Sequence, residues 1–206
     1  MELGVAHMKN GDYRDAAMRF RFVCWRNPKN FIAHYLQGKS YVFAGKYEKA
    51  IKPLKIALAN KPELDEAKFL LATCGEKVDI EEIPPSILIE HLDKAAEVYD
   101  SEVIEQSELT PLVSKVVEEY FEGKQGFGVL HLDCRAGDAP AAIFSRSDHM
   151  VGTDPSLKML SKARDKRVDD RLVYNELVGK TARDYLDICE KKFDIIFSTN
   201  LSLIHI

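Results

Sequence analysis

Apolar and small residues recur along the first 80 positions with a period of 34. The first set is Gly4, Gly11, Tyr13, Ala16, Phe20 and Pro28, and the second set is Gly38, Gly45, Tyr47, Ala50, Leu54 and Pro62. This period is that of a unit of two antiparallel helices. Small residues let the two helices approach closely, glycine permits a tight turn with positive φ, and proline ends the second helix. The pattern therefore predicts two helical hairpins within residues 1–77, followed by a capping helix from residue 65 that covers the last apolar face.

These residues resemble the tetratricopeptide repeat (TPR) family, most strongly over residues 31–64. The resemblance implies a groove that binds a protein or peptide partner. Pro53 interrupts the second helix of this repeat and predicts a local kink, because proline has no N–H to donate. The alternative interpretation is that the repeat residues serve packing alone. We expect four polar residues to face the groove: His34, Gln37, Tyr41 and Lys68.

A domain boundary is expected at residues 78–86, where two prolines and several acids disfavour both helix and strand. Amphipathic helices are predicted over 87–106 and 111–124. Buried strands then alternate with helices, and we expect them over 127–132, 149–154, 171–177 and 191–200. This alternation predicts an α/β domain over 87–206 with a parallel sheet and right-handed crossovers.

A loop after the first of these strands and an acid at the end of the second form the pattern of a nucleotide-type site. Asp154 lies 22 positions beyond the end of the first strand, a spacing that suits a bond to a ribose diol. Its alternative role is to cap the helix that follows. His131 ends the first strand, and we favour a hydrogen-bonded core histidine over a catalytic base there.

Two segments, VLHLDCRAG (129–137) and VGTDPSLKMLSKAR (151–164), are similar to the first two motifs of class I S-adenosylmethionine-dependent methyltransferases. LDKAAEVYD (92–100) and VYNEL (173–177) look like segments of TPR-linked members of that family. The resemblance implies the fold class α + α/β, with helical TPR hairpins followed by a partial Rossmann-like parallel sheet and flanking helices. It implies S-adenosylmethionine as the cofactor, with six candidate contacts: Asp133, Cys134, Arg135, Ala136, Gly137 and Asp154.

Several of these positions depart from the family's pattern. Asp133 and Arg135 replace loop glycines, which the family needs because its backbone approaches the methionine moiety closely. Asp133 adds a negative charge near the expected methionine carboxylate, and Arg135 either offsets that charge or fills the pocket. Thr181 and Asn200 replace acids that follow the third and fourth strands. We therefore expect an impaired or inactive cofactor site, and the catalytic residues stay unassigned.

The number of predicted strands also supports the expectation of an impaired or inactive cofactor site. The family fold has seven strands, whereas this sequence ends near the fourth, and Met1 falls inside a repeat helix. We therefore expect a fragment or the product of a decayed or frameshifted gene, with an unpaired sheet edge.

Composition and charge indicate which class of protein this is and which partners and location to expect. Hydrophobic residues make up 46% and charged residues 30% of 206, which is the range of folded rather than disordered proteins. A net charge of −4 gives no reason to expect nucleic acid or an anionic membrane as a partner. The start lacks a signal-peptide core and the apolar runs are short, so we expect a cytoplasmic protein. Four cysteines without a CxxC pair indicate neither a metal site nor a disulfide framework.

Two functions from different classes agree with these observations. The first is a TPR-linked methyltransferase whose repeats recruit a protein substrate. The second is a non-catalytic interaction protein in which the methyltransferase-like fold is vestigial. The fold alone does not distinguish them.

Overall fold

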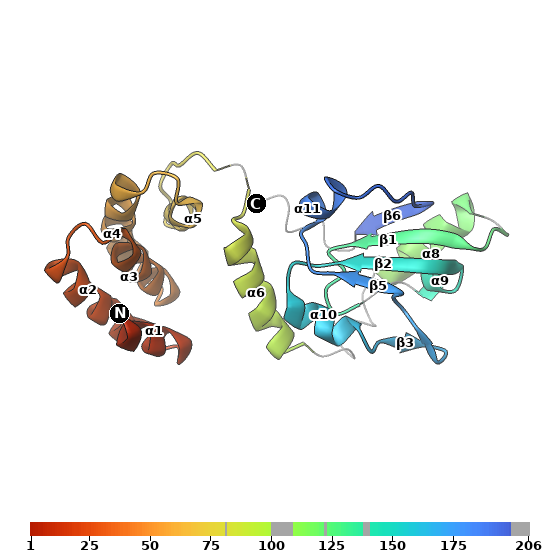
Figure 1. Cartoon of the computed structure of the whole chain (residues 1–206), viewed down its shortest axis with the longest axis horizontal. Coiled ribbons are helices and arrows are strands. Elements are labelled where there is room, and N and C mark those ends of the chain that lie inside the picture. Colours follow the sequence, from red (N-terminus) through yellow and green to blue (C-terminus); the bar gives the residue numbers. More distant parts are fainter. Residues whose placement is uncertain (81, 100–108, 122, 138–140, 199–206) are drawn as a thin grey trace. The chain divides into compact units, whose positions relative to one another are not determined.

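The computed structural model describes residues 1–80, 82–99, 109–121, 123–137 and 141–198. The chain divides into two compact units, Met1–Pro84 and Pro85–Ile206. The first unit is helical, and the second contains a parallel sheet with helices (Figure 1).

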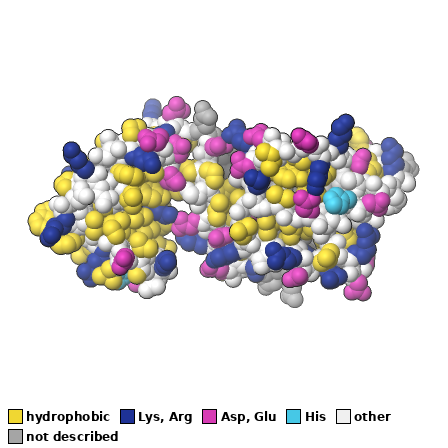
Figure 2. Space-filling view, in the orientation of Figure 1, with side chains coloured by type: hydrophobic (Ala, Val, Ile, Leu, Met, Phe, Trp, Pro, Cys, Tyr) yellow, Lys and Arg dark blue, Asp and Glu magenta, His cyan; other side chains and the backbone are white. Residues whose placement is uncertain are grey.

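The helical unit consists of two helical hairpins and a further helix. Its helices are α1 (Glu2–Lys9), α2 (Tyr13–Arg26), α3 (Phe31–Phe43), α4 (Tyr47–Asn60) and α5 (Asp65–Thr73). Each helix packs against the next along the chain, and α5 also contacts α3. The two predicted hairpins are confirmed, and a further helix, α5, begins at residue 65, where a capping helix is expected. Hydrophobic side chains also gather on the face of this unit that Figure 2 shows.

Close contact between paired helices recurs at equivalent places in the two hairpins. A Cβ added to Gly4 would lie 2.7 Å from the Phe20 ring, and one added to Gly38 would lie 2.5 Å from Leu54 Cγ. Phe20 and Leu54 are fully buried, so neither side chain has free space into which to move. The turns between the paired helices contain Gly11 and Gly45, with φ of 81° and 68°. Glycine is therefore required at these turns for its backbone freedom, as the sequence predicted.

The second unit contains a four-stranded sheet in the order β5-β2-β1-β6, in which every pairing is parallel. Its strands are β1 (Phe127–Leu132), β2 (Ser147–Thr153), β5 (Glu176–Val178) and β6 (Ile195–Ser198). Its helices are α6 (Pro85–Glu97), α8 (Leu109–Tyr120), α9 (Ala141–Phe144), α10 (Leu157–Ala163) and α11 (Ala182–Leu186). The predicted amphipathic helices over 87–106 and 111–124 correspond to α6 and α8, and residues 100–106 and 122 of these predictions lie outside the described residues.

Side chains of β1 and β2 are buried on both faces of the sheet. Val129 and Met150 belong to a cluster that includes residues of α8, α9 and α10. Leu130 and Val151 pack on the opposite face with Tyr185 of α11. Burial on both faces explains the consecutive apolar residues Val129 and Leu130 of β1 and Met150 and Val151 of β2.

The third predicted strand, 171–177, is divided in the structure. Its start forms β4 (Arg171–Leu172), which pairs antiparallel with β3 (Arg167–Val168), and its end joins the main sheet as β5. Asn175 separates the two parts: its Oδ1 accepts a hydrogen bond from Met150 N, and its own N–H donates to Met150 O. The apolar run alone did not indicate this change of partner strand.

The contact between Gly38 and Leu54 gives a stability prediction. Gly38→Ala should gain about 1 kcal/mol of helix propensity but lose more through overlap with Leu54, for a net destabilisation of about 1–2 kcal/mol. Far-ultraviolet circular dichroism during urea unfolding would measure this change. Adding Leu54→Ala should cost less in the Gly38→Ala background than alone, because the new methyl group occupies part of the space vacated. Additive effects of the two substitutions would contradict the proposed contact.

Candidate functional site

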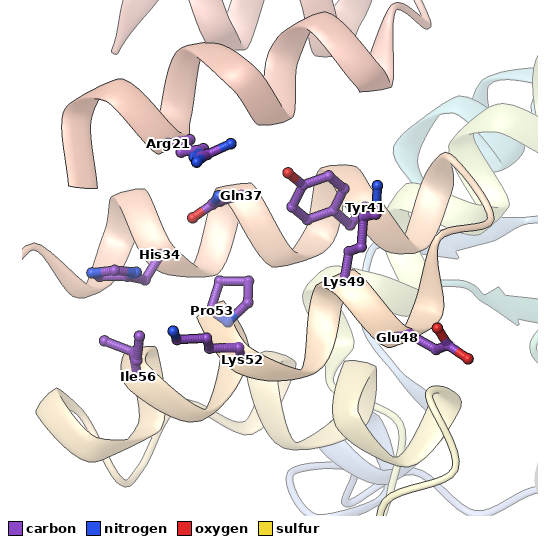
Figure 3. Close-up of a pocket in the computed structure, with 9 residues that line it drawn as sticks. All are labelled: Arg21, His34, Gln37, Tyr41, Glu48, Lys49, Lys52, Pro53 and Ile56. Carbon is purple, nitrogen blue, oxygen red and sulfur yellow. The ribbon is translucent and has the colours of Figure 1, made fainter. Parts of the chain in front are cut away.

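A cavity of about 450 Å³ lies in the helical unit, between side chains of α2, α3 and α4 (Figure 3). We call it the α2–α4 groove. Nine residues line it: Arg21, His34, Gln37, Tyr41, Glu48, Lys49, Lys52, Pro53 and Ile56. Its volume is in the range of sites that accept small ligands or a few side chains.

His34 contributes a buried polar group to the groove. Its side chain is 7% exposed, and Nε2 donates a hydrogen bond of 3.0 Å to the Pro28 carbonyl oxygen. Since a carbonyl can only accept, this bond places a ring proton on Nε2. Nδ1 has no hydrogen-bond partner within the part of the chain that the structure describes. Buried polar groups are usually paired, so an unpaired one in a cavity wall is notable.

Pro53 contributes a backbone acceptor. Helix α4 runs through Pro53 without interruption. A proline has no N–H, so the carbonyl of Lys49, four residues earlier, lacks its helical donor. Lys49 and Pro53 both line the groove.

The charged side chains of the groove are mostly cationic. Arg21, Lys49 and Lys52 carry positive charge, whereas Glu48 carries the single negative charge among the lining residues. The resulting potential favours an anionic group over a cationic one.

The sequence predicted part of this lining. His34, Gln37 and Tyr41 line the groove as expected, but Lys68 does not. Lys68 instead forms an ion pair of 2.7 Å with Asp65 Oδ1, one turn earlier on α5. Arg21, Lys49 and Lys52 were missed because each reads as an ordinary exposed charge on an amphipathic helix. Their common face becomes visible only when α2 and α4 flank α3.

The loop after β1 is the second candidate site, and its backbone has left-handed conformations. Asp133 and Arg135 have φ of 51° and 48°, and Gly137 has φ of 91°. The first two positions are those where the methyltransferase resemblance implies glycine. The backbone therefore adopts a conformation that favours glycine even where other residues occupy it.

Most amides in this loop already bond to protein acceptors. Cys134 N donates to Thr153 O at 2.8 Å, Gly137 N donates to Cys134 O at 2.9 Å, and Arg135 N donates to Asp154 Oδ2 at 3.0 Å. These three donors stabilise the loop itself and are not directed at a ligand.

Asp154 joins this loop to the start of α10. Its side chain has no exposed surface, and its second oxygen, Oδ1, accepts a bond of 2.8 Å from Ser156 N. Burial raises the pKa of Asp154 to about 6, although the amides of Ser156 and Arg135 oppose the shift. The N-cap of α10 is Ser156, whose side chain accepts from Met159 N. The ribose-binding role of Asp154 stays a prediction.

The remaining loop residues pack against neighbouring elements. Ala136 lies in a buried cluster with Leu92 and Ala96 of α6 and with Met159. Cys134 is 1% exposed and belongs to the main sheet cluster. Burial raises the pKa of the Asp133 carboxyl, and the charge of Arg135 opposes this shift.

His131 is a core residue. It has no exposed surface, its Nδ1 lies 2.8 Å from the Tyr174 hydroxyl, and its ring stacks on Phe197 at 4.2 Å between centroids. Burial lowers the pKa of His131 to about 3, so the imidazole is neutral at physiological pH. Thr181, at one expected acid position, is the N-cap of α11 and accepts from Asp184 N. Asn200 lies outside the described residues.

Comparison with known families identifies the helical unit. The tetratricopeptide repeat model matches residues 1–65 and 35–77. The N-terminal region consists of tetratricopeptide repeats. A comparison with curated proteins gives no match. Among solved structures, a mutant O-GlcNAc transferase of Thermobaculum terrenum is 16% identical, with a TM-score of 0.42. The alignment covers 85% of this chain and 33% of that one, so the chain spans a third of the transferase's length.

Two further properties of the described residues concern membranes and metal ions. Among the described residues, no helix combines the length and the apolar character that crossing a bilayer requires. Within the same stretches of chain, no three or more His, Cys, Asp or Glu side chains are grouped in a way that could hold a metal ion.

The burial of Asp154 predicts a pH dependence of stability. Its pKa is raised from 3.8 to about 6, so between about pH 4 and 6 the folded state retains a proton that the unfolded state has released. The free energy of unfolding should therefore fall as pH rises through this window, by roughly 3 kcal/mol. Chemical unfolding at a series of pH values would measure it. Asp154→Asn, which does not titrate, should show a smaller dependence, and an unchanged dependence would contradict the assignment.

Proposed function

We propose that this is an interaction protein whose repeats bind an acidic segment of a partner protein in the α2–α4 groove. The observation that supports the proposal is the charge of the lining, with Arg21, Lys49 and Lys52 around one cavity. The Lys49 carbonyl adds an acceptor that α4 does not use, because of Pro53. Such a site suits a peptide, which offers carboxylates to the cations and backbone N–H groups to the carbonyl.

The size of the groove sets the expected strength of binding. A cavity of about 450 Å³ accommodates a few side chains and not a whole folded domain. The cations are solvent-accessible, so each contributes modestly and is screened by salt. We therefore expect dissociation constants of about 1–100 μM that rise with ionic strength.

Charge reversal in the groove tests this proposal. Peptides selected from a random library displayed on phage should be rich in Asp and Glu, and they should bind Lys49→Glu/Lys52→Glu at least about tenfold more weakly by fluorescence anisotropy. Lys29→Glu is the control, because Lys29 is exposed but does not line the groove. Selection of neutral or basic peptides, or equal weakening by the control, would disprove the proposal.

The second candidate function is an S-adenosylmethionine site in the sheet unit. The order β5-β2-β1-β6 places the loop after β1 at the carboxyl edge of a parallel sheet, where such folds bind ligands. The left-handed conformations at Asp133, Arg135 and Gly137 agree with the resemblance of residues 129–137 to a methyltransferase motif.

The residues present do not fit this cofactor well. Asp154 has no exposed surface and already accepts two backbone hydrogen bonds. The charged side chains of Asp133 and Arg135 occupy positions where the resemblance implies glycine. We therefore propose that the site is impaired or inactive, and that the methyltransferase-like unit is vestigial.

Thermal unfolding with added cofactor tests this second candidate. A ligand at a hundredfold excess over its dissociation constant stabilises the folded state by about 2.7 kcal/mol. We expect little or no shift in melting temperature with millimolar S-adenosylmethionine. Asp133→Gly/Arg135→Gly should recover part of the shift, and adding Asp154→Ala should remove it again. Micromolar binding by the unmodified chain, abolished by Asp154→Ala, would show the site to be functional.

A further inference from the structure

Helix α2 exposes three large apolar side chains in a row on its outward face. Met18, Phe22 and Trp25 are 67%, 60% and 71% exposed, and their spacing of four and three residues places them on one face of the helix. The rings of Phe22 and Trp25 contact each other, with centroids 5.8 Å apart. We call these residues the α2 apolar row. Figure 2 shows hydrophobic surface with Lys and Arg side chains around it on this unit.

The repeat fold does not require this row. The equivalent positions in the second repeat, 34 residues later, are Lys52, Ile56 and Ala59. A residue needed for packing within a repeat would recur, as the Gly4–Phe20 and Gly38–Leu54 contacts do. The exposed row is therefore specific to the first repeat.

Four arginines border the row on both sides. At 100° per residue, Arg14 and Arg21 lie on one side of it, and Arg19 and Arg26 lie on the other. All four side chains are exposed, and Asp15 is the one acid in the helix. The surface is thus an apolar row flanked by four arginines, with Asp15 on the same side as Arg19 and Arg26.

This charge pattern identifies the kind of partner. A second copy of the chain pairing through the same face would bring arginine rows together, which is unfavourable. A helix with apolar residues at the same spacing and acids on both flanks would bury the row and pair with the arginines. The contact between the Phe22 and Trp25 rings leaves them as one continuous ridge, which suits such a helix better than separately stacked nucleotide bases.

We propose that the α2 apolar row and its arginines dock an amphipathic helix with acidic flanks, supplied by a partner protein. This inference rests on the proposed interaction function and names the partner's chemistry. Arg21 lies beside the row and also lines the α2–α4 groove, so the two surfaces are continuous. One segment can therefore place an acidic end in the groove and its apolar face on α2.

The position of tryptophan makes the test specific. Trp25 is the only tryptophan in the chain, so intrinsic fluorescence reports directly on this surface. The probes are the peptides selected by phage display on the full-length chain. We expect them to contain apolar residues at helical spacing between Asp and Glu residues and to shift the emission of Trp25 to shorter wavelength.

Substitution of the row completes the experiment. Phe22→Ala/Trp25→Ala should weaken binding at least about tenfold by fluorescence anisotropy. Tyr120→Ala should leave binding unchanged, because Tyr120 is an aromatic residue of α8 with comparable exposure, 72%. Circular dichroism would verify that all variants fold.

Each other outcome rejects the inference in a distinguishable way. One such outcome concerns peptides that bind Lys49→Glu/Lys52→Glu more weakly than the unmodified chain. If these peptides do not shift the emission of Trp25 and bind Phe22→Ala/Trp25→Ala with unchanged affinity, binding in the groove stands and docking on α2 is overturned. The absence of any acidic peptide would reject both. Self-association that buries Trp25, measured by sedimentation, or tighter binding of single-stranded oligonucleotides or anionic vesicles than of peptides, would assign the surface to a different partner.

Discussion

The α2–α4 groove depends on how closely α3 and α4 approach each other. Gly38 has no side chain, and the fully buried Leu54 fills the space that a Cβ would occupy. This contact fixes α4 against α3 and thereby sets the position of Lys49, Lys52 and Pro53 relative to His34. The arrangement of cations in the groove is therefore a consequence of core packing, and not of contacts among the cations themselves.

A different constraint organises the sheet unit. Asp154 accepts amides from both the loop after β1 and the start of α10, and Ser156 next to it donates to Asp93 Oδ1 of α6 at 2.5 Å. One buried carboxylate and its neighbour thus link three elements. A carboxylate committed in this way stabilises the loop in its left-handed conformation whether or not a ligand is present.

The helical unit could be predicted from sequence almost entirely, because its contacts are local and recur every 34 residues. Apolar runs also predicted the strand β1 and the loop after it. They further predicted that His131 lies in the core. The division of 171–177 was not, because it depends on the hydrogen bonds of Asn175 to Met150 of β2, 25 positions away. The hydrogen bonds of Asp154 to the amides of Arg135 and Ser156 could not be predicted either. The sequence pattern identifies an acid at the end of a strand but does not indicate which backbone amides lie close to it. Lys68 was misplaced because it lies on α5, whereas the residues that line the groove belong to α2, α3 and α4.

The locality of the groove bears on the order in which the two units acquire structure. All nine lining residues lie between positions 21 and 56, so their contacts close over short loops. The pairing of β1 with β6, in contrast, joins residues that are about 66 positions apart, such as Val129 and Ile195. During synthesis the N-terminal unit generally folds first. The repeats of this chain would then be folded, and able to engage a partner on the nascent chain, before β6 has left the ribosome.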